Sequence, residues 1–146
     1  MAASSAAPES GAIDGRQAAR SVAAGASAVA AALYVLIGFG VVSVGESTTA
    51  GGAPDLLAFG LMTGGTFAVA AALLALRESR ILWIALAVLN VIVIVGYVAA
   101  ASIRSPSYEP WGLAIKACQA VALVAVVYLA IRGPHVGRLV SRGTGY

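Results

Sequence analysis

Residues 81–103 read ILWIALAVLNVIVIVGYVAAASI, an apolar run without Asp, Glu, Lys or Arg. Its many valines and isoleucines are also typical of β-strands, but a run of this length far exceeds an ordinary strand and matches a helix that crosses a bilayer. We therefore predict a transmembrane helix over residues 81–103. Asn90 lies near its middle, where an unpaired amide in hydrocarbon is costly, so we expect Asn90 to face another helix or water.

Three further apolar runs of similar length flank this one, at residues 21–44, 56–76 and 110–131. Only 10% of the chain is charged and 60% is hydrophobic, whereas about a quarter of a soluble domain is charged. The sequence therefore predicts an all-α integral membrane protein, a four-helix antiparallel bundle that forms one domain over residues 16–132. The short charged connection at residues 77–80 is expected to hold the second and third spans as antiparallel neighbours.

The two ends of the chain differ from this apolar domain. Residues 1–15 are small, polar and interrupted by proline and glycine, which predicts a disordered N-terminal tail. The first apolar run follows Arg16 and Arg20 like a secretory signal, but it is too long for one, so we interpret it as the first transmembrane helix. Residues 133–146 form a basic C-terminal tail that begins with the helix-stopping pair Gly133–Pro134.

Basic residues are distributed unequally between the two sides of the predicted bundle. Cytoplasmic loops of membrane proteins carry an excess of Lys and Arg, and seven basic residues fall on one side: Arg16, Arg20, Arg77, Arg80, Arg132, Arg138 and Arg142. Only Arg104 and Lys116 lie near the other. We therefore expect both termini in the cytoplasm, with the protein in the plasma membrane of a bacterium, the inner membrane. The same orientation places three acidic residues on the external side: Glu46, Asp55 and Glu109. Asp55 is also expected to cap the second helix.

Ionisable and amide side chains enter the fourth span from its N-terminal end. Pro110 is suited to the first helical turn and Glu109 precedes it, so Lys116 lies roughly 9 Å into the span. Glu109, Lys116 and Gln119 share one helix face. Three interpretations remain open. Lys116 extends its stem back towards water, it pairs with Glu109 or another external carboxylate, or it takes part in binding a ligand or ion. Tyr108 and Trp111 are expected at the membrane boundary, as is Trp83 at the other end of its span.

The second span carries small residues at a spacing of four, which are Gly60, Gly64, Ala68 and Ala72. Such stripes let a second helix approach closely, and close van der Waals contact is the main attraction between helices in lipid. We therefore predict that these four residues form a helix-packing face. The first span, with Ala24, Ala28 and Ala32, is the expected partner.

The sequence contains no recognisable catalytic constellation. Its only histidine, His135, and its only cysteine, Cys118, have no neighbours at metal-ligand spacing, and no phosphate-binding or nucleophile motif is present. The tyrosines Tyr34, Tyr97 and Tyr128 are widely separated and are given no chemistry. We expect no cofactor, no metal and no enzymatic activity. The net charge of +3 follows from membrane topology and does not indicate a nucleic-acid partner.

These observations favour a small accessory or structural subunit that acts through helix packing, as a homo-oligomer or within a larger membrane complex. The alternative is a protein that transports a small solute or binds a lipid or quinone, with a polar cavity around Asn90, Lys116 and Gln119. The layout of four spans with short connections resembles that of DoxX-like small membrane proteins. No residue motif extends this likeness to a function or a site.

Overall fold

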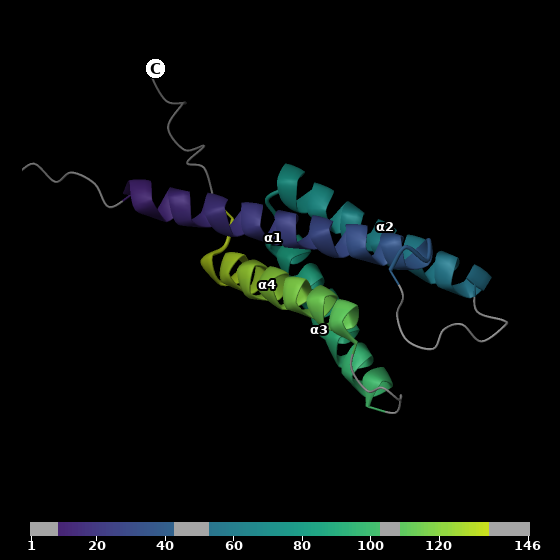
Figure 1. The fold of residues 1–146 in the computed structure, drawn as a ribbon. Coiled ribbons are helices and arrows are strands. Elements are labelled where there is room, and N and C mark those ends of the chain that lie inside the picture. Colours follow the sequence, from purple (N-terminus) through teal and green to yellow (C-terminus); the bar gives the residue numbers. More distant parts are fainter. Residues whose placement is uncertain (1–8, 43–52, 103–108, 135–146) are drawn as a thin grey trace, which may run out of the picture.

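The computed structural model describes residues 9–42, 53–102 and 109–134, and these residues form helices without a strand. The helices are α1 (Glu9–Gly38), α2 (Ala53–Leu76), α3 (Arg80–Ala101) and α4 (Pro110–Arg132) (Figure 1). All four contain a segment that is long and apolar enough to cross a membrane: Gly15–Gly38, Leu56–Leu76, Arg80–Ala99 and Pro110–Arg132.

Large apolar side chains cover the outside of these helices. Ile81 is 80% exposed, and Met62 and Ile131 are each 75% exposed. Many other Val, Leu and Ile side chains are exposed as well. Such a surface would be strongly unfavourable in water, whereas lipid tails solvate it well. The exposed surface and the helix lengths together are those of a multi-pass membrane protein.

The ends of α1 differ from the predicted first span. The helix begins at Glu9, inside the stretch predicted to be a disordered tail, and it ends at Gly38 although the apolar run continues to Val44. Gly40 causes the early end, because it adopts a left-handed φ of 69°. Its N–H donates to the Ile37 carbonyl at 2.9 Å, and the next N–H donates to the Leu36 carbonyl at 3.0 Å. This pair of bonds is a Schellman motif, a common way to end a helix.

The starts of the other helices follow local chemistry. The Ser79 hydroxyl accepts a hydrogen bond from the Leu82 N–H at 3.4 Å and caps α3, while Pro110 occupies the first turn of α4 as expected. α2 begins at Ala53, so Asp55, expected as a cap, lies within its first turn. The predictions for Glu46, Arg104, Tyr108, His135, Arg138 and Arg142 lie outside the residues that the structure describes.

α1 and α4 are the two central helices of the arrangement, because each packs against two others. α1 packs against α2 and α4, and α3 packs against α4. In Figure 1, α2 follows α1, whereas α3 runs with α4 and separates from α2. The second and third spans, predicted as neighbours, therefore make no comparable contact along their lengths within the described residues. The short connection between them does not force such contact, because the close-packing face of α2 is directed towards α1.

Two buried clusters hold the helices together. One combines residues of all four helices, including Ala23, Leu74, Trp83 and Val126. Trp83 was expected at the membrane boundary, but it is only 1% exposed and fills the space where the helices meet. Burial of its large ring against apolar neighbours outweighs the preference of tryptophan for the interface. Trp111 is 47% exposed at the start of α4, as an interfacial anchor would be.

The second cluster joins α1, α2 and α4 through Tyr34, Phe67, Ile115 and their neighbours. The Tyr34 ring stacks on Phe67 with 5.8 Å between ring centroids and meets Phe59 edge-on at 5.9 Å. Both arrangements are favourable aromatic geometries. This cluster consequently fixes the Tyr34 side chain between three helices.

Glycines set the distance between α1 and α2. A Cβ added to Gly60 would lie 2.5 Å from the Cα of Gly38 and 2.6 Å from the Tyr34 carbonyl oxygen. A Cβ on Gly64 would lie 2.8 Å from a methyl carbon of Val35 and 3.0 Å from the Ala31 carbonyl oxygen. Because the two backbones approach so closely, only glycine fits at these positions without displacement.

The other half of the predicted packing stripe lies elsewhere. Ala68 and Ala72 are exposed and do not share the α1-facing side with Gly60 and Gly64. A spacing of four residues advances by about 40° per step around a helix of 3.6 residues per turn, so a long stripe with this spacing leaves the contact face. The contact continues instead through Phe67 and Leu74. On α1, Ala28 and Ala32 are also exposed, and Ala24 is half-buried.

Two arginines near the start of α1 contact the ends of other helices. Arg20 donates through Nε to the Leu74 carbonyl and through a terminal nitrogen to the Ala75 carbonyl at 2.7 Å. Its other terminal nitrogen lies 2.8 Å from an oxygen of Glu78. The last carbonyls of a helix have no partner within it and carry the negative end of its dipole. Arg20 therefore caps α2 from a neighbouring helix.

Arg16 lies one turn earlier on α1 and donates to the carbonyl oxygen of Gly133, directly after α4. The two arginines thus tie α1 to the C-terminal ends of both helices that it contacts. These contacts of Arg16 and Arg20 could not be predicted from the sequence, because residue spacing does not reveal which helix end lies beside them.

Candidate functional site

Lys116 on α4 is directed into the bundle towards α1. Its Nζ donates to the Tyr34 hydroxyl oxygen at 3.0 Å and to the Gln119 side-chain oxygen at 2.6 Å. Gln119 in turn donates through Nε2 to the same Tyr34 oxygen at 3.3 Å. Gln119 and Tyr34 are 0% and 5% exposed, whereas Lys116 is only half-buried. The three side chains form a closed triangle of hydrogen bonds.

Two aromatic rings complete the surroundings of Lys116. Its Nζ lies 5.7 Å from the centroid of the Tyr34 ring and 5.0 Å from the centroid of the Tyr97 ring, which comes from α3. The negative face of an aromatic ring attracts a cation at such distances. We refer to Tyr34, Tyr97, Lys116 and Gln119 as the Lys116 cluster.

Gly112 determines where Tyr97 lies. The Tyr97 ring and hydroxyl lie over this glycine, and an added Cβ would be 2.9 Å from two ring carbons. Gly112 is one turn before Lys116 on α4, so the missing side chain lets Tyr97 approach the same helix face. The cluster therefore depends on Gly112, which no sequence motif singles out.

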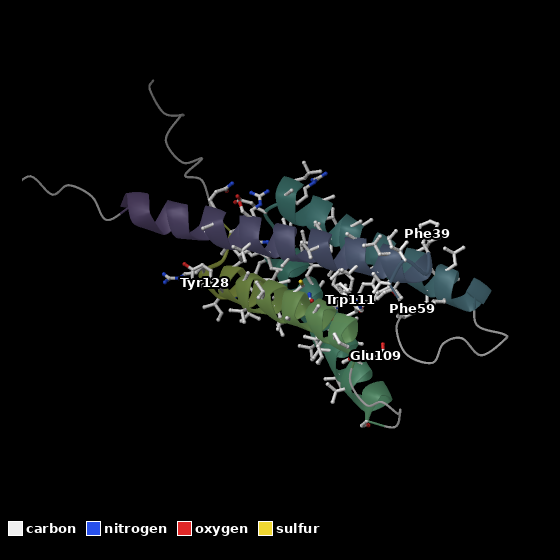
Figure 2. All side chains as sticks on the ribbon, viewed as in Figure 1. Phe39, Phe59, Glu109, Trp111 and Tyr128 are labelled. Atoms are coloured by element: carbon white, nitrogen blue, oxygen red, sulfur yellow. The ribbon has the colours of Figure 1, made fainter. Side chains whose placement is uncertain are left out.

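Glu109 does not pair with Lys116. It precedes α4, its side chain makes no capping bond, and its Oε2 is buried without a hydrogen-bond partner among the described residues. Figure 2 shows Glu109 and Trp111 at one end of α4 and Tyr128 at the other. Gln119 lies one turn farther into the span than Lys116, so the ammonium bonds a deeper group. The structure thus shows no pair between Lys116 and Glu109, whereas the side chains of Glu46 and Asp55 lie outside the described part of the chain.

Asn90 lies outside the Lys116 cluster. It is 2% exposed, as expected for an inward-facing amide, and its Nδ2 donates to the Leu86 carbonyl of its own helix at 2.8 Å. Its Oδ1 is buried without a partner among the described residues. Asn90 thus bonds a backbone carbonyl of the preceding turn and not the Gln119 side chain. Of the three residues expected around one polar cavity, Lys116 and Gln119 lie together and Asn90 bonds separately.

Tyr34 and Tyr97 are the members of the cluster that sequence reasoning missed. They are 63 residues apart, so no local motif links them. Their depth provides a signal, however. Each lies four residues before the end of its helix, at Gly38 or Ala101, and Lys116 lies six residues after the start of α4. Counting residues from helix ends on the same side of the membrane brings these three side chains to a similar level.

The chemistry available at the cluster is that of a positioned cation with hydrogen-bond donors. Within the described part of the chain, no group of three His, Cys, Asp or Glu residues could hold a metal ion. Cys118 is a free, half-buried thiol. The cluster can bind and orient a group that accepts hydrogen bonds. It offers neither a nucleophile paired with a base nor a set of metal ligands.

Comparison with known proteins gives no further assignment: no family model, curated protein or solved structure matches the chain.

Proposed function

We propose that this chain is a small integral membrane subunit that acts by helix association, as a homo-oligomer or as an accessory part of a larger membrane complex. Its four spans form an antiparallel bundle with both termini in the cytoplasm of a bacterium. The unequal distribution of basic residues supports this orientation.

The orientation leads to a direct prediction. A reporter that is active only outside the cytoplasm, fused after Tyr146, is expected to remain inactive, while a cytoplasmic reporter at the same position is active. A fusion within residues 45–52 should give the opposite pattern. Activity of the external reporter after Tyr146 would contradict four spans with both ends inside.

One observation carries the proposal of helix association. The side of α2 that does not contact α1 exposes small residues at spacings of three, four and seven, Ala58, Gly65, Ala68 and Ala72, beside larger apolar residues such as Leu61 and Val69. A helix that only met lipid would gain nothing from small side chains there, because lipid solvates leucine and valine equally well. A row of small residues lets another helix approach closely. The outward face of α2, defined by these four residues, is therefore the proposed association surface.

Native mass measurement in mild detergent tests this proposal. The purified protein is expected as a dimer or higher oligomer, or together with a second membrane protein. The double change Ala68→Leu and Ala72→Leu should abolish this association, because bulky side chains hold the helices apart. Val124→Leu provides the matched control, since Val124 is 70% exposed and lies on α4, outside the proposed surface of α2. A strictly monomeric wild-type protein without a co-purifying partner would count against the proposal.

A further inference from the structure

The Lys116 ammonium is held inside the bundle by neutral groups. Glu78 and Glu109, the two carboxylates whose side chains the structure describes, form no ion pair with it, and its partners are the Tyr34 hydroxyl and the Gln119 amide. A cation at this depth in a bilayer is unfavourable unless an opposite charge or water compensates it. The cluster therefore has a positive charge that these two carboxylates do not neutralise.

Lys116 also keeps a hydrogen-bond donor for a further group. An ammonium has three N–H donors, and two of them bond Tyr34 and Gln119. Lys116 is half-buried while these two partners are almost completely covered, so Lys116 is the member of the triangle that keeps exposed surface. Tyr34 and Gln119 serve to position it.

Tyr97 supplies a second donor beside the first. Its ring centroid is 5.0 Å from Lys116 Nζ, the side chain is half-buried, and its hydroxyl makes no hydrogen bond within the described part of the chain. Gly112 leaves the space in which this ring lies. A cation and a phenol hydroxyl from two different helices thus face the same small region.

The surroundings of these donors are apolar. Leu113 and Ala120, one turn before and one turn after Lys116 on the same face of α4, are both exposed. Lys116 lies roughly 9 Å from the start of α4. A ligand that places an oxygen there must therefore enter the hydrocarbon layer with an apolar body and a small polar end.

We propose that Lys116 and Tyr97 bind the oxyanion of a single-chain amphiphile in the membrane, with a carboxylate of the fatty-acid type fitting best. The carboxylate neutralises the ammonium and accepts hydrogen bonds from Lys116 Nζ and the Tyr97 hydroxyl, while its chain lies along α4. A small headgroup reaches this depth more readily than the headgroup of a two-chain phospholipid. This site lies on α3 and α4 and goes beyond the proposed helix association through α2.

Direct binding measurements on the full chain in a non-ionic detergent test the proposal. Laurate is the probe, compared with dodecyl phosphate, phosphatidylglycerol, acetate and dodecanol. Laurate is expected to bind best and dodecanol at least tenfold more weakly. Lys116→Met should weaken laurate binding about tenfold or more, because it retains the stem and removes the charge. Tyr97→Phe retains the ring over Gly112 and should weaken binding about three- to tenfold, the range of one hydrogen bond.

Matched changes at the other end of the bundle serve as controls. Arg80→Gln removes an exposed cation and Tyr128→Phe removes a hydroxyl, and both should leave laurate binding unchanged. The proposal is overturned if dodecanol or a neutral short-chain quinone binds as tightly as laurate, if acetate alone binds equally well, or if phosphatidylglycerol is preferred. Unchanged affinity in both Lys116→Met and Tyr97→Phe, or no laurate binding by the wild type, contradicts it as well.

Discussion

Gly60→Ala is expected to destabilise the protein by about 2–3 kcal/mol, the upper range for overpacking of a close contact. The added Cβ would lie 2.5 Å from the Gly38 Cα and 2.6 Å from the Tyr34 carbonyl oxygen, and real Cβ atoms essentially never come within 3.0 Å of such atoms. Both neighbours are backbone atoms of α1, so they cannot move aside as a side-chain end can. The helices must separate and lose contacts that lipid does not replace. Thermal unfolding in detergent measures the effect.

Gly25→Ala is the matched control for this change. Gly25 lies within α1, but an added Cβ would meet nothing within 4 Å. Alanine also forms helices better than glycine, so stability should stay the same or increase slightly. Equal stability of the Gly60→Ala and Gly25→Ala variants would show that α1 and α2 do not pack as closely as the structure indicates. Gly64→Leu should resemble Gly60→Ala, because its side chain would displace Val35 and the α1 backbone.

Arg20→Met is expected to lower stability by about 2–3 kcal/mol. The change keeps much of the apolar stem but removes the donors to the Leu74 and Ala75 carbonyls, which belong to the last turn of α2. Hydrogen bonds to charged groups contribute about 1.5–3 kcal/mol, and unpaired carbonyls at a helix end near other protein atoms are unfavourable. Thermal unfolding in the same detergent gives the comparison with wild type.

Glu78→Gln separates the two roles of Arg20. The Glu78 side chain is 45% exposed, so its ion pair with Arg20 is screened and should contribute only about 0–1 kcal/mol. We expect Glu78→Gln to have a small effect and Arg20→Met a large one. If the two variants were equally destabilised, the ion pair and not the capping of α2 would be the main contribution of Arg20.

The helices themselves follow from the sequence because their length and apolar composition leave few alternatives. Pro110 predicts the start of α4, and the structure begins that helix at the same residue. The end of α1 could not be predicted from hydropathy, because Phe39, Val41 and Val42 are as apolar as the helix and only the φ of Gly40 separates them. A glycine within an apolar run is equally compatible with a packed helix, as Gly60 shows.

The interior was harder to predict because it depends on which helices meet. Gln119 and Asn90 are both amides within apolar spans, yet one joins the Lys116 cluster and the other bonds its own backbone. Tyr34 and Tyr97 gain a role only when α1 and α3 are placed on either side of α4. Trp83 likewise has the sequence position of a boundary residue, but the meeting of four helices buries it.

Cysteine cross-linking in native membranes tests the proposed helix association most directly. Cys118→Ser removes the only cysteine, and Ala72→Cys then places one on the outward face of α2. A short cross-linker with one thiol-reactive and one photoreactive end is expected to convert Ala72→Cys into a covalent dimer, or to join it to a partner protein, while Val124→Cys on α4 remains largely uncross-linked. Equal cross-linking at both positions, or none at Ala72→Cys, would contradict association through α2.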